Sequence, residues 1–143
     1  MAAASFTPTL LAPRVAATIG RGLRAGGTPQ PELCPIAPES EGAAGVGELL
    51  EALDFDARMR QARAVIVAEA CPNKRTPAGR SLIGSATFEI ATRARQAGVP
   101  AYAVLAKNAL DSFDARMLDL QVVLEAGNAR ALIAAGRKLA TLI

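Results

Sequence analysis

The stretch that decides the fold runs from residue 64 to residue 106 and reads AVIVAEACPNKRTPAGRSLIGSATFEIATRARQAGVPAYAVLA. It begins and ends with apolar runs, at 64–68 and 101–106, which have the length and composition of strands covered on both faces. Between them, residues 81–97 have the length of a helix, which the glycine and proline of residues 97–100 bring to an end. This order predicts two adjacent, parallel strands joined by a helical crossover.

Weaker strand signals lie on both sides of this unit. Residues 32–36 contain Pro35, which favours an edge strand. Residues 120–124 are typical of a further strand, and residues 1–5 are typical of a shortened first strand. Helical patterns occupy the intervening segments 11–25, 46–62 with a break near Asp54, and 128–139. The alternation predicts one α/β domain over residues 1–143, a three-layer α/β/α sandwich with a mostly parallel sheet of about five strands.

Composition narrows the possible function classes. The chain has no histidine, which excludes Ser-His and Cys-His nucleophile pairs, histidine general bases and zinc sites that contain histidine. Cys34 and Cys71 allow one internal disulfide at most, and no export signal precedes them, so we expect two thiols in a cytoplasmic protein. No apolar run approaches the roughly 18 residues that span a bilayer, so we expect no membrane partner.

The formal net charge of +3 arises from 16 basic and 13 acidic residues. The basic residues are scattered along the expected helices, and the few aromatic residues lie far apart in the sequence. Nucleic-acid-binding surfaces instead gather cations and stacking rings on one face. We therefore expect no nucleic-acid partner.

The loop after the strand at 64–68 is the richest in chemistry, because parallel α/β sheets bind ligands beyond the carboxyl ends of their strands. Glu69 stands at the strand end, and Lys74, Arg75 and Arg80 precede a helix that we expect to begin at Ser81. Backbone N–H groups of that helix and the three cations are together suited to hold a phosphate or carboxylate. The alternative is a solvated basic loop in which Ser81 is an ordinary helix cap.

The pentapeptide Phe-Asp-Ala-Arg-Met occurs twice, at 55–59 and 113–117, and each copy precedes an expected strand. Asp54 and Ser112, the latter with Asp111, are suited to cap short helices whose Phe and Met, four residues apart, pack onto the sheet. The alternative is a repeated binding motif, which two short copies do not establish.

Two segments in the first half of the chain resemble motifs of bacterial glycerate kinases. Residues 5–10, SFTPTL, and the alanine-rich helix after them are similar to the family's opening, where an Asp-Ser-Phe-Lys-Gly-Ser-Leu motif precedes a helix. Residues 34–42, CPIAPESEG, are similar to its Pro-Leu-Ala-Asp-Gly-Gly-Glu-Gly loop and keep the glutamate as Glu41. Thr7 and Pro38 replace the lysine and the aspartate of these two motifs.

Residues 65–105 resemble a late segment of the same family, Val-Ile-Thr-Gly-Glu-Gly-Arg-Leu-Asp followed by a helix that ends in Ala-Gly-Val-Pro. Glu69, Thr76 and Gly79 stand at matching positions, whereas Arg80 replaces a lysine. Members of the family are longer, two-domain proteins, and their large middle portion has no counterpart in this sequence. The chain therefore resembles a shortened relative.

The resemblance implies a phosphotransferase ancestry, in which ATP with Mg²⁺ phosphorylates glycerate. The residues that the loops and the resemblance place at a substrate or phosphate site are Ser5, Glu41, Glu69, Asn73, Lys74, Arg75, Thr76, Arg80 and Ser81. Phosphoryl transfer depends on positioning and on charge stabilisation, so the loss of a lysine and an aspartate implies that kinase activity is weak or lost.

We therefore expect a glycerate-kinase-like protein whose cleft binds a small organic acid, such as glycerate, or its phosphate. One alternative is an active ATP-dependent glycerate kinase that completes its cleft by forming a homo-oligomer. A second alternative is a structural or regulatory partner of a longer protein.

Overall fold

A five-stranded, all-parallel sheet forms the centre of the protein, whose computed structural model describes residues 1–36, 45–72, 74–77 and 79–143. In spatial order its strands are β2 (Cys34–Pro35), β1 (Ala2–Ala3), β3 (Val65–Glu69), β6 (Ala101–Leu105) and β7 (Leu120–Glu125). β3 and β6 are parallel neighbours, which confirms the prediction made from residues 64–106. Pro35 lies in an edge strand, as expected for a residue that has no N–H to donate.

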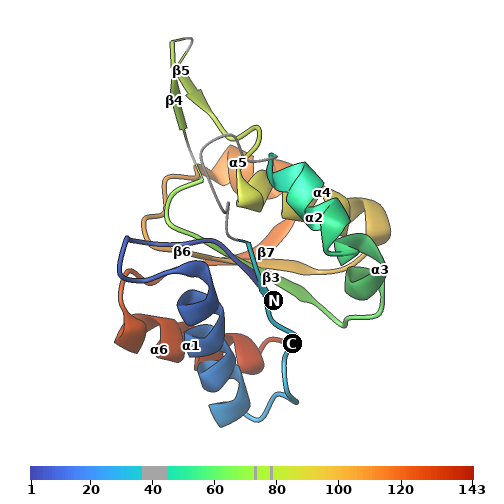
Figure 1. Ribbon diagram of the computed structural model, residues 1–143, viewed down its shortest axis with the longest axis vertical. Coiled ribbons are helices and arrows are strands. Elements are labelled where there is room, and N and C mark those ends of the chain that lie inside the picture. Colours follow the sequence, from blue (N-terminus) through green and yellow to red (C-terminus); the bar gives the residue numbers. More distant parts are fainter. Residues whose placement is uncertain (37–44, 73, 78) are drawn as a thin grey trace.

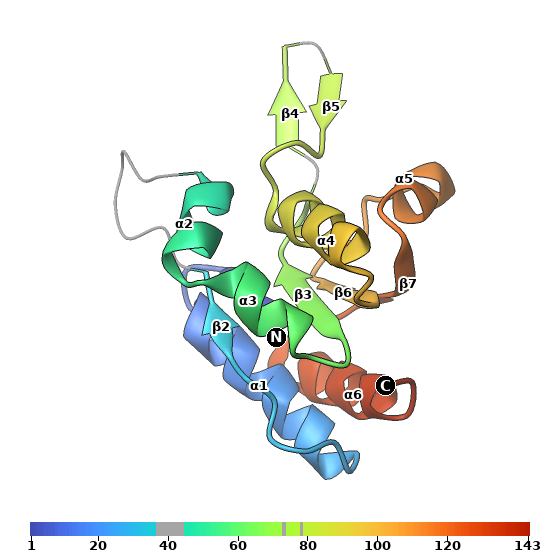
Figure 2. The same ribbon diagram turned by 90° about the vertical axis from the view of Figure 1, so that its right-hand side faces the viewer.

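Helices cover both faces of the sheet and complete an α/β/α sandwich (Figure 1). One face carries α1 (Ala12–Ala25) and α6 (Ala129–Ala140), and the other carries α2 (Val46–Ala52), α3 (Phe55–Arg60) and α4 (Ala86–Ala97). A short helix, α5 (Ser112–Met117), lies beside β7 (Figure 2). The predicted break near Asp54 is confirmed, because this residue has a left-handed φ of 49° and separates α2 from α3.

Alternate residues of β3 face opposite sides of the sheet and join two apolar cores. Val65 and Val67 pack among the side chains of α2, α3 and α4, such as Ile90. Ile66 and Ala68 pack beneath α1 and α6. All four strand residues are buried, which agrees with the apolar run that predicted a strand covered on both faces.

A projecting hairpin follows β3 that the sequence analysis did not predict. β4 (Lys74–Thr76) and β5 (Gly79–Ser81) pair in antiparallel fashion and extend beyond the carboxyl ends of the sheet strands (Figures 1 and 2). The prediction that a helix begins at Ser81 is wrong, because α4 begins at Ala86. Gly84 has a φ of 79°, a left-handed conformation that glycine adopts readily, and the chain turns there just before α4.

The two copies of the repeated pentapeptide form helices with different degrees of burial. In α3, Phe55 is 5% exposed and Met59 is 4% exposed, so both pack onto the sheet as predicted. In α5, Phe113 is 66% exposed and Met117 is 40% exposed, so the same prediction is wrong for the second copy. The caps were predicted only in part. The Asp111 carboxylate accepts N–H groups from the first turn of α5, whereas Ser112 is the first residue of that helix and Asp54 makes no side-chain cap hydrogen bond to α3.

The helices α1 and α6 approach each other so closely that their backbones touch at two glycines. A Cβ atom on Gly22 would lie 2.3 Å from the carbonyl oxygen of Ile133, and a Cβ atom on Gly136 would lie 2.4 Å from that of Ile19. Both distances are far below van der Waals contact, so no side chain fits at either position. This close approach holds the apolar faces of the two helices together above the sheet.

We expect Gly136→Ala to lower the free energy of unfolding by at least about 1–3 kcal/mol, because the added methyl group meets backbone that cannot move aside. Gly47→Ala in α2 is the matched control, since the nearest described atom to its added Cβ is 3.6 Å away. That control should be neutral or should stabilise the helix by up to about 1 kcal/mol. Urea denaturation followed by circular dichroism measures both changes, and equal losses would contradict the backbone contact.

Candidate functional site

The connections that follow β1 and β3 leave the sheet on opposite faces. α1 follows β1 onto one face, whereas α4 follows β3 onto the other. Since β1 and β3 are neighbours, their carboxyl ends form a topological switch point, the place at which parallel α/β proteins commonly bind ligands. Ser5 follows β1 and Glu69 ends β3, so two of the predicted site residues come together at this point.

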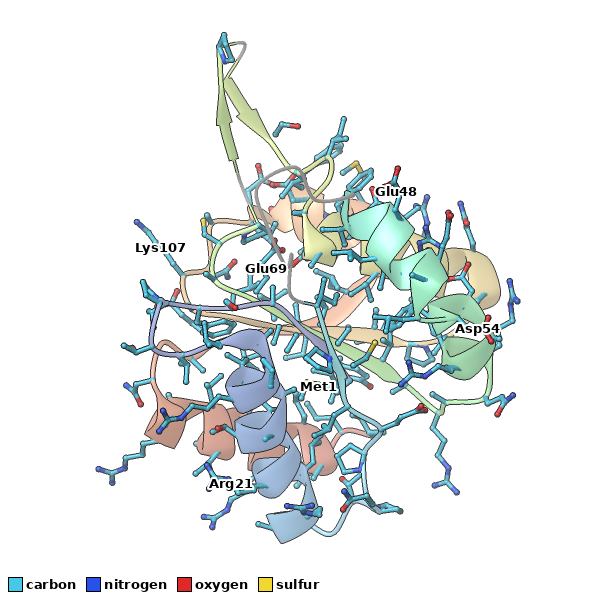
Figure 3. All side chains as sticks on the ribbon, in the orientation of Figure 1. Met1, Arg21, Glu48, Asp54, Glu69 and Lys107 are labelled. Carbon is cyan, nitrogen blue, oxygen red and sulfur yellow. The ribbon has the colours of Figure 1, made fainter. Side chains whose placement is uncertain are left out.

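Glu69 caps the first turn of α4 with its carboxylate. Its Oε1 accepts the Ala86 N–H at 3.2 Å, and its Oε2 accepts the N–H and the hydroxyl of Thr87 at 2.9 and 2.8 Å. A negative charge at this place also offsets the positive end of the helix dipole. The N–H groups that the sequence analysis assigned to an external anion are therefore bonded to a side chain of the protein itself. Figure 3 shows Glu69 beneath the hairpin.

Ser5 has the same role at the start of α1. Its Oγ accepts the Ala12 N–H at 3.0 Å. The turn between the two residues is closed by the Phe6 N–H, which donates to the Leu10 carbonyl at 2.9 Å. At both helices of the switch point, the first N–H thus donates to a side chain that lies at the end of the preceding strand or just after it.

The cations of the predicted anion site lie on the hairpin instead of at a helix start. The β4–β5 register pairs Arg75 with Arg80 and Lys74 with Ser81. No Asp or Glu occurs in residues 70–88, so the three cations have no acidic neighbour in the sequence. Like charges at opposing positions destabilise a pair of strands, and a bound anion would relieve that repulsion.

The structure therefore brings together only part of the predicted site. Ser5 and Glu69 share the switch point, whereas the predicted residues of the hairpin are Lys74, Arg75, Thr76, Arg80 and Ser81. The Ser81 hydroxyl accepts the Ile83 N–H at 3.3 Å and caps no helix. Glu41 and Asn73 lie outside the described residues.

The sequence analysis missed two residues that hold the start of α4 in place at the carboxyl edge of the sheet. Ser85 is the N-cap of α4, and its Oγ accepts the Phe88 N–H at 3.0 Å. Thr87 is fully buried and donates its hydroxyl to Glu69. The signal for this helix start was the dipeptide Gly84-Ser85, a turn residue followed by a favoured N-cap.

A groove of about 740 Å³ opens at the opposite, amino-terminal edge of the sheet. Cys34 and Arg58 line it, and the Arg58 Nη1 lies 3.8 Å from the Cys34 Sγ. Burial raises the pKa of the Cys34 thiol, although the neighbouring guanidinium acts in the opposite direction. A hydrogen bond to Glu32 raises the pKa of Arg58. Burial thus disfavours the nucleophilic thiolate form of Cys34, whereas Cys71 is an exposed thiol.

Comparisons with known proteins add no family assignment. No protein-family model matches the chain, and neither the curated proteins nor the solved structures contain a significant match. In the part of the chain that the structure describes, no three Asp, Glu, His or Cys side chains form a group able to hold a metal ion. Among the same residues, no helix is long and apolar enough to cross a membrane.

We expect Glu69→Ala to lower the free energy of unfolding by about 1.5–3 kcal/mol, because it leaves the Ala86 and Thr87 donors without their charged acceptor. Glu125→Ala is the matched control, since Glu125 also ends a strand but is exposed and accepts one N–H, from Asn108. That substitution should cost less than about 1 kcal/mol. Chemical denaturation measures both, and similar losses would show that Glu69 is no special cap.

Proposed function

We propose that this protein binds a small organic anion, a hydroxy carboxylate or its phosphate ester, through the cations of the β4–β5 hairpin. The observation that carries the proposal is the pairing of Arg75 with Arg80 across the hairpin. Guanidinium groups present donors in a planar fork that suits carboxylate and phosphate oxygens.

The distribution of charge supports an anionic ligand. Lys74, Arg75 and Arg80 supply three positive charges, as many as the formal net charge of +3 of the whole chain. No acidic residue occurs in residues 70–88, so the hairpin segment of the sequence carries a local charge of +3. A concentrated positive charge attracts anions and raises their association rate.

The site geometry favours binding by side chains over binding at helix ends. Glu69 and Ser5 already bond the first N–H groups of α4 and α1, so an anion gains little from the helix starts at the switch point. The hairpin projects above the same edge of the sheet, where ligands of parallel α/β proteins commonly bind. The resemblance of Glu69, Thr76 and Gly79 to glycerate kinase motifs supports a small hydroxy acid as the ligand class.

The described residues do not fit the ATP and Mg²⁺ that the same resemblance implies. Both carboxylate oxygens of Glu69 already accept hydrogen bonds from α4, which leaves this residue poorly placed to hold a hard cation. Thr7 and Pro38 stand where the family has a lysine and an aspartate. We therefore propose anion binding with kinase activity weak or lost.

Thermal unfolding in the presence of glycerate, 3-phosphoglycerate or inorganic phosphate tests the binding proposal. A ligand at about 100 times its Kd stabilises the folded chain by about 2.7 kcal/mol, which raises the Tm. Arg80→Ala removes one charge-assisted contact worth about 1.5–3 kcal/mol, so it should weaken binding by at least about tenfold and abolish most of the shift. Arg75→Ala should act in the same way.

Arg130→Ala is the matched control, because Arg130 is an exposed arginine in the first turn of α6. It should leave the shift in Tm intact. Equal shifts in the wild type and in all three variants would show that the hairpin is only a solvated basic surface. Tighter binding of a DNA or RNA oligonucleotide than of any small anion, with a steep dependence on salt, would replace the proposal by nucleic-acid binding.

The same proposal predicts slow phosphoryl transfer. With ATP, Mg²⁺ and glycerate, we expect turnover far below the roughly 1–100 s⁻¹ of working kinases, because positioning and charge stabilisation carry that reaction. Coupled detection of ADP, with mass detection of phosphoglycerate, measures the rate. A rate within that window that is lost in Arg80→Ala and retained in Arg130→Ala would instead establish an active kinase.

A further inference from the structure

The two edges of the sheet differ in how they are protected against pairing with another strand. β2 has two residues, and one of them is Pro35, which cannot donate a backbone hydrogen bond. β7 has six residues, Leu-Gln-Val-Val-Leu-Glu, with no proline, glycine or lysine. Long apolar edges of this kind are the ones that accept a further strand. No strand of the described chain lies beyond β7.

The backbone of β7 presents hydrogen-bonding groups on its outer side. The Ala126 N–H donates to the Leu105 carbonyl at 2.8 Å, and Leu105 is in register with Glu125. In a parallel ladder every second residue bonds the neighbouring strand, so Leu124 and Ala126 face β6. Val123 and Glu125 consequently direct their N–H and carbonyl groups away from the sheet. The bulge at Gln121 leaves the register of residues 122–125 regular.

The side chains near this edge are apolar and only partly covered. Val123 packs against the core under α4, and Val122 and Leu124 pack against the core under α6, yet none of the three is fully buried. Next to them, α5 leaves Phe113 66% exposed and Met117 40% exposed. α3 buries the same pair of residue types against the sheet, so the α5 pair lacks the cover that its counterpart has.

We propose that β7 pairs with β7 of a second copy of this chain, in antiparallel fashion about a two-fold axis at Val123, to form a continuous sheet of ten strands. In this register Val123 lies opposite Val123 of the second copy, and the two exchange both of their outward N–H···O bonds. Val122 lies opposite Leu124 of the second copy, which places apolar side chains against each other on the other face.

The charges along the edge favour a second copy as the occupant. Glu125 is the one charged residue of β7, and the same register sets it opposite the neutral amide of Gln121 in the second copy. No like charges oppose each other within the paired strands, so the edge is complementary to itself. The short, proline-containing β2 edge closes the assembly at both ends and limits it to a dimer.

Sedimentation equilibrium of the full chain over a range of concentrations tests the proposal, together with two substitutions of Gln121. Gln121→Lys sets a cation opposite Glu125 in two symmetric places and should tighten the dimer, whereas Gln121→Glu sets two like charges together and should weaken it. Each change should alter the dimer dissociation constant by between about twofold and thirtyfold. Gln121 is exposed, and within the part of the chain that the structure describes its side chain bonds Asp119 nearby, so both variants keep the fold.

Gln61→Lys and Gln61→Glu are the matched controls, because Gln61 is exposed, precedes β3 and lies outside β7. They change the net charge equally and should leave the dissociation constant unchanged. Amide exchange by NMR gives a second readout, in which the Val123 N–H becomes slower to exchange as protein concentration rises. A chain that stays monomeric at every concentration overturns the proposal, and so does a dimer that responds equally to the Gln61 and Gln121 variants.

Discussion

The Glu69 carboxylate joins the central strand of the sheet to the helix that crosses over it. Its two oxygens accept three hydrogen bonds from the first turn of α4, and two of these come from a fully buried threonine, Thr87. The hydrogen bond between Glu69 and Ala86 holds together the two ends of the segment that connects β3 to α4. This segment therefore leaves the sheet and returns to it at the carboxyl end of β3. The hairpin, its cations and the start of α4 all take their positions from this contact.

Because Glu69 caps a helix, an acidic residue at the end of a strand does not by itself indicate a ligand or metal site. The sequence pattern of an acid followed by cations and a helix is also the pattern of an anion or metal site. Here the acid serves the helix, and the cations stand apart from it on the hairpin. The proposed anion binding therefore depends on the arginine pair, Arg75 and Arg80, and on Lys74.

The parallel unit was predictable because its signals are local and agree with each other. The apolar runs at 64–68 and 101–106 have strand length, and Gly98 with Pro100 ends the helix between them. The hairpin at 74–81 was not predictable in the same way, since its two strands contain no apolar side chain and show no alternation of apolar and polar residues. Because the sequence does not predict the hairpin, it predicts that the helix starts at Ser81, whereas the N-cap of α4 is Ser85. The two copies of the pentapeptide show a further limit of prediction from a short motif. Phe55 is buried and Phe113 is exposed because different elements lie near each copy, and five residues of sequence do not determine which elements lie nearby.

The glycine contact between α1 and α6 has a consequence for how the chain is made. The two helices stand near opposite ends of the sequence, at residues 12–25 and 129–140, so the core they share closes a loop that spans most of the chain. During synthesis, α1 leaves the ribosome early, but Ile19 and Leu23 have no complete cover until α6 follows. Such contacts between distant segments slow folding. The nascent chain thus lacks full cover for the apolar face of α1 until α6 has been synthesised.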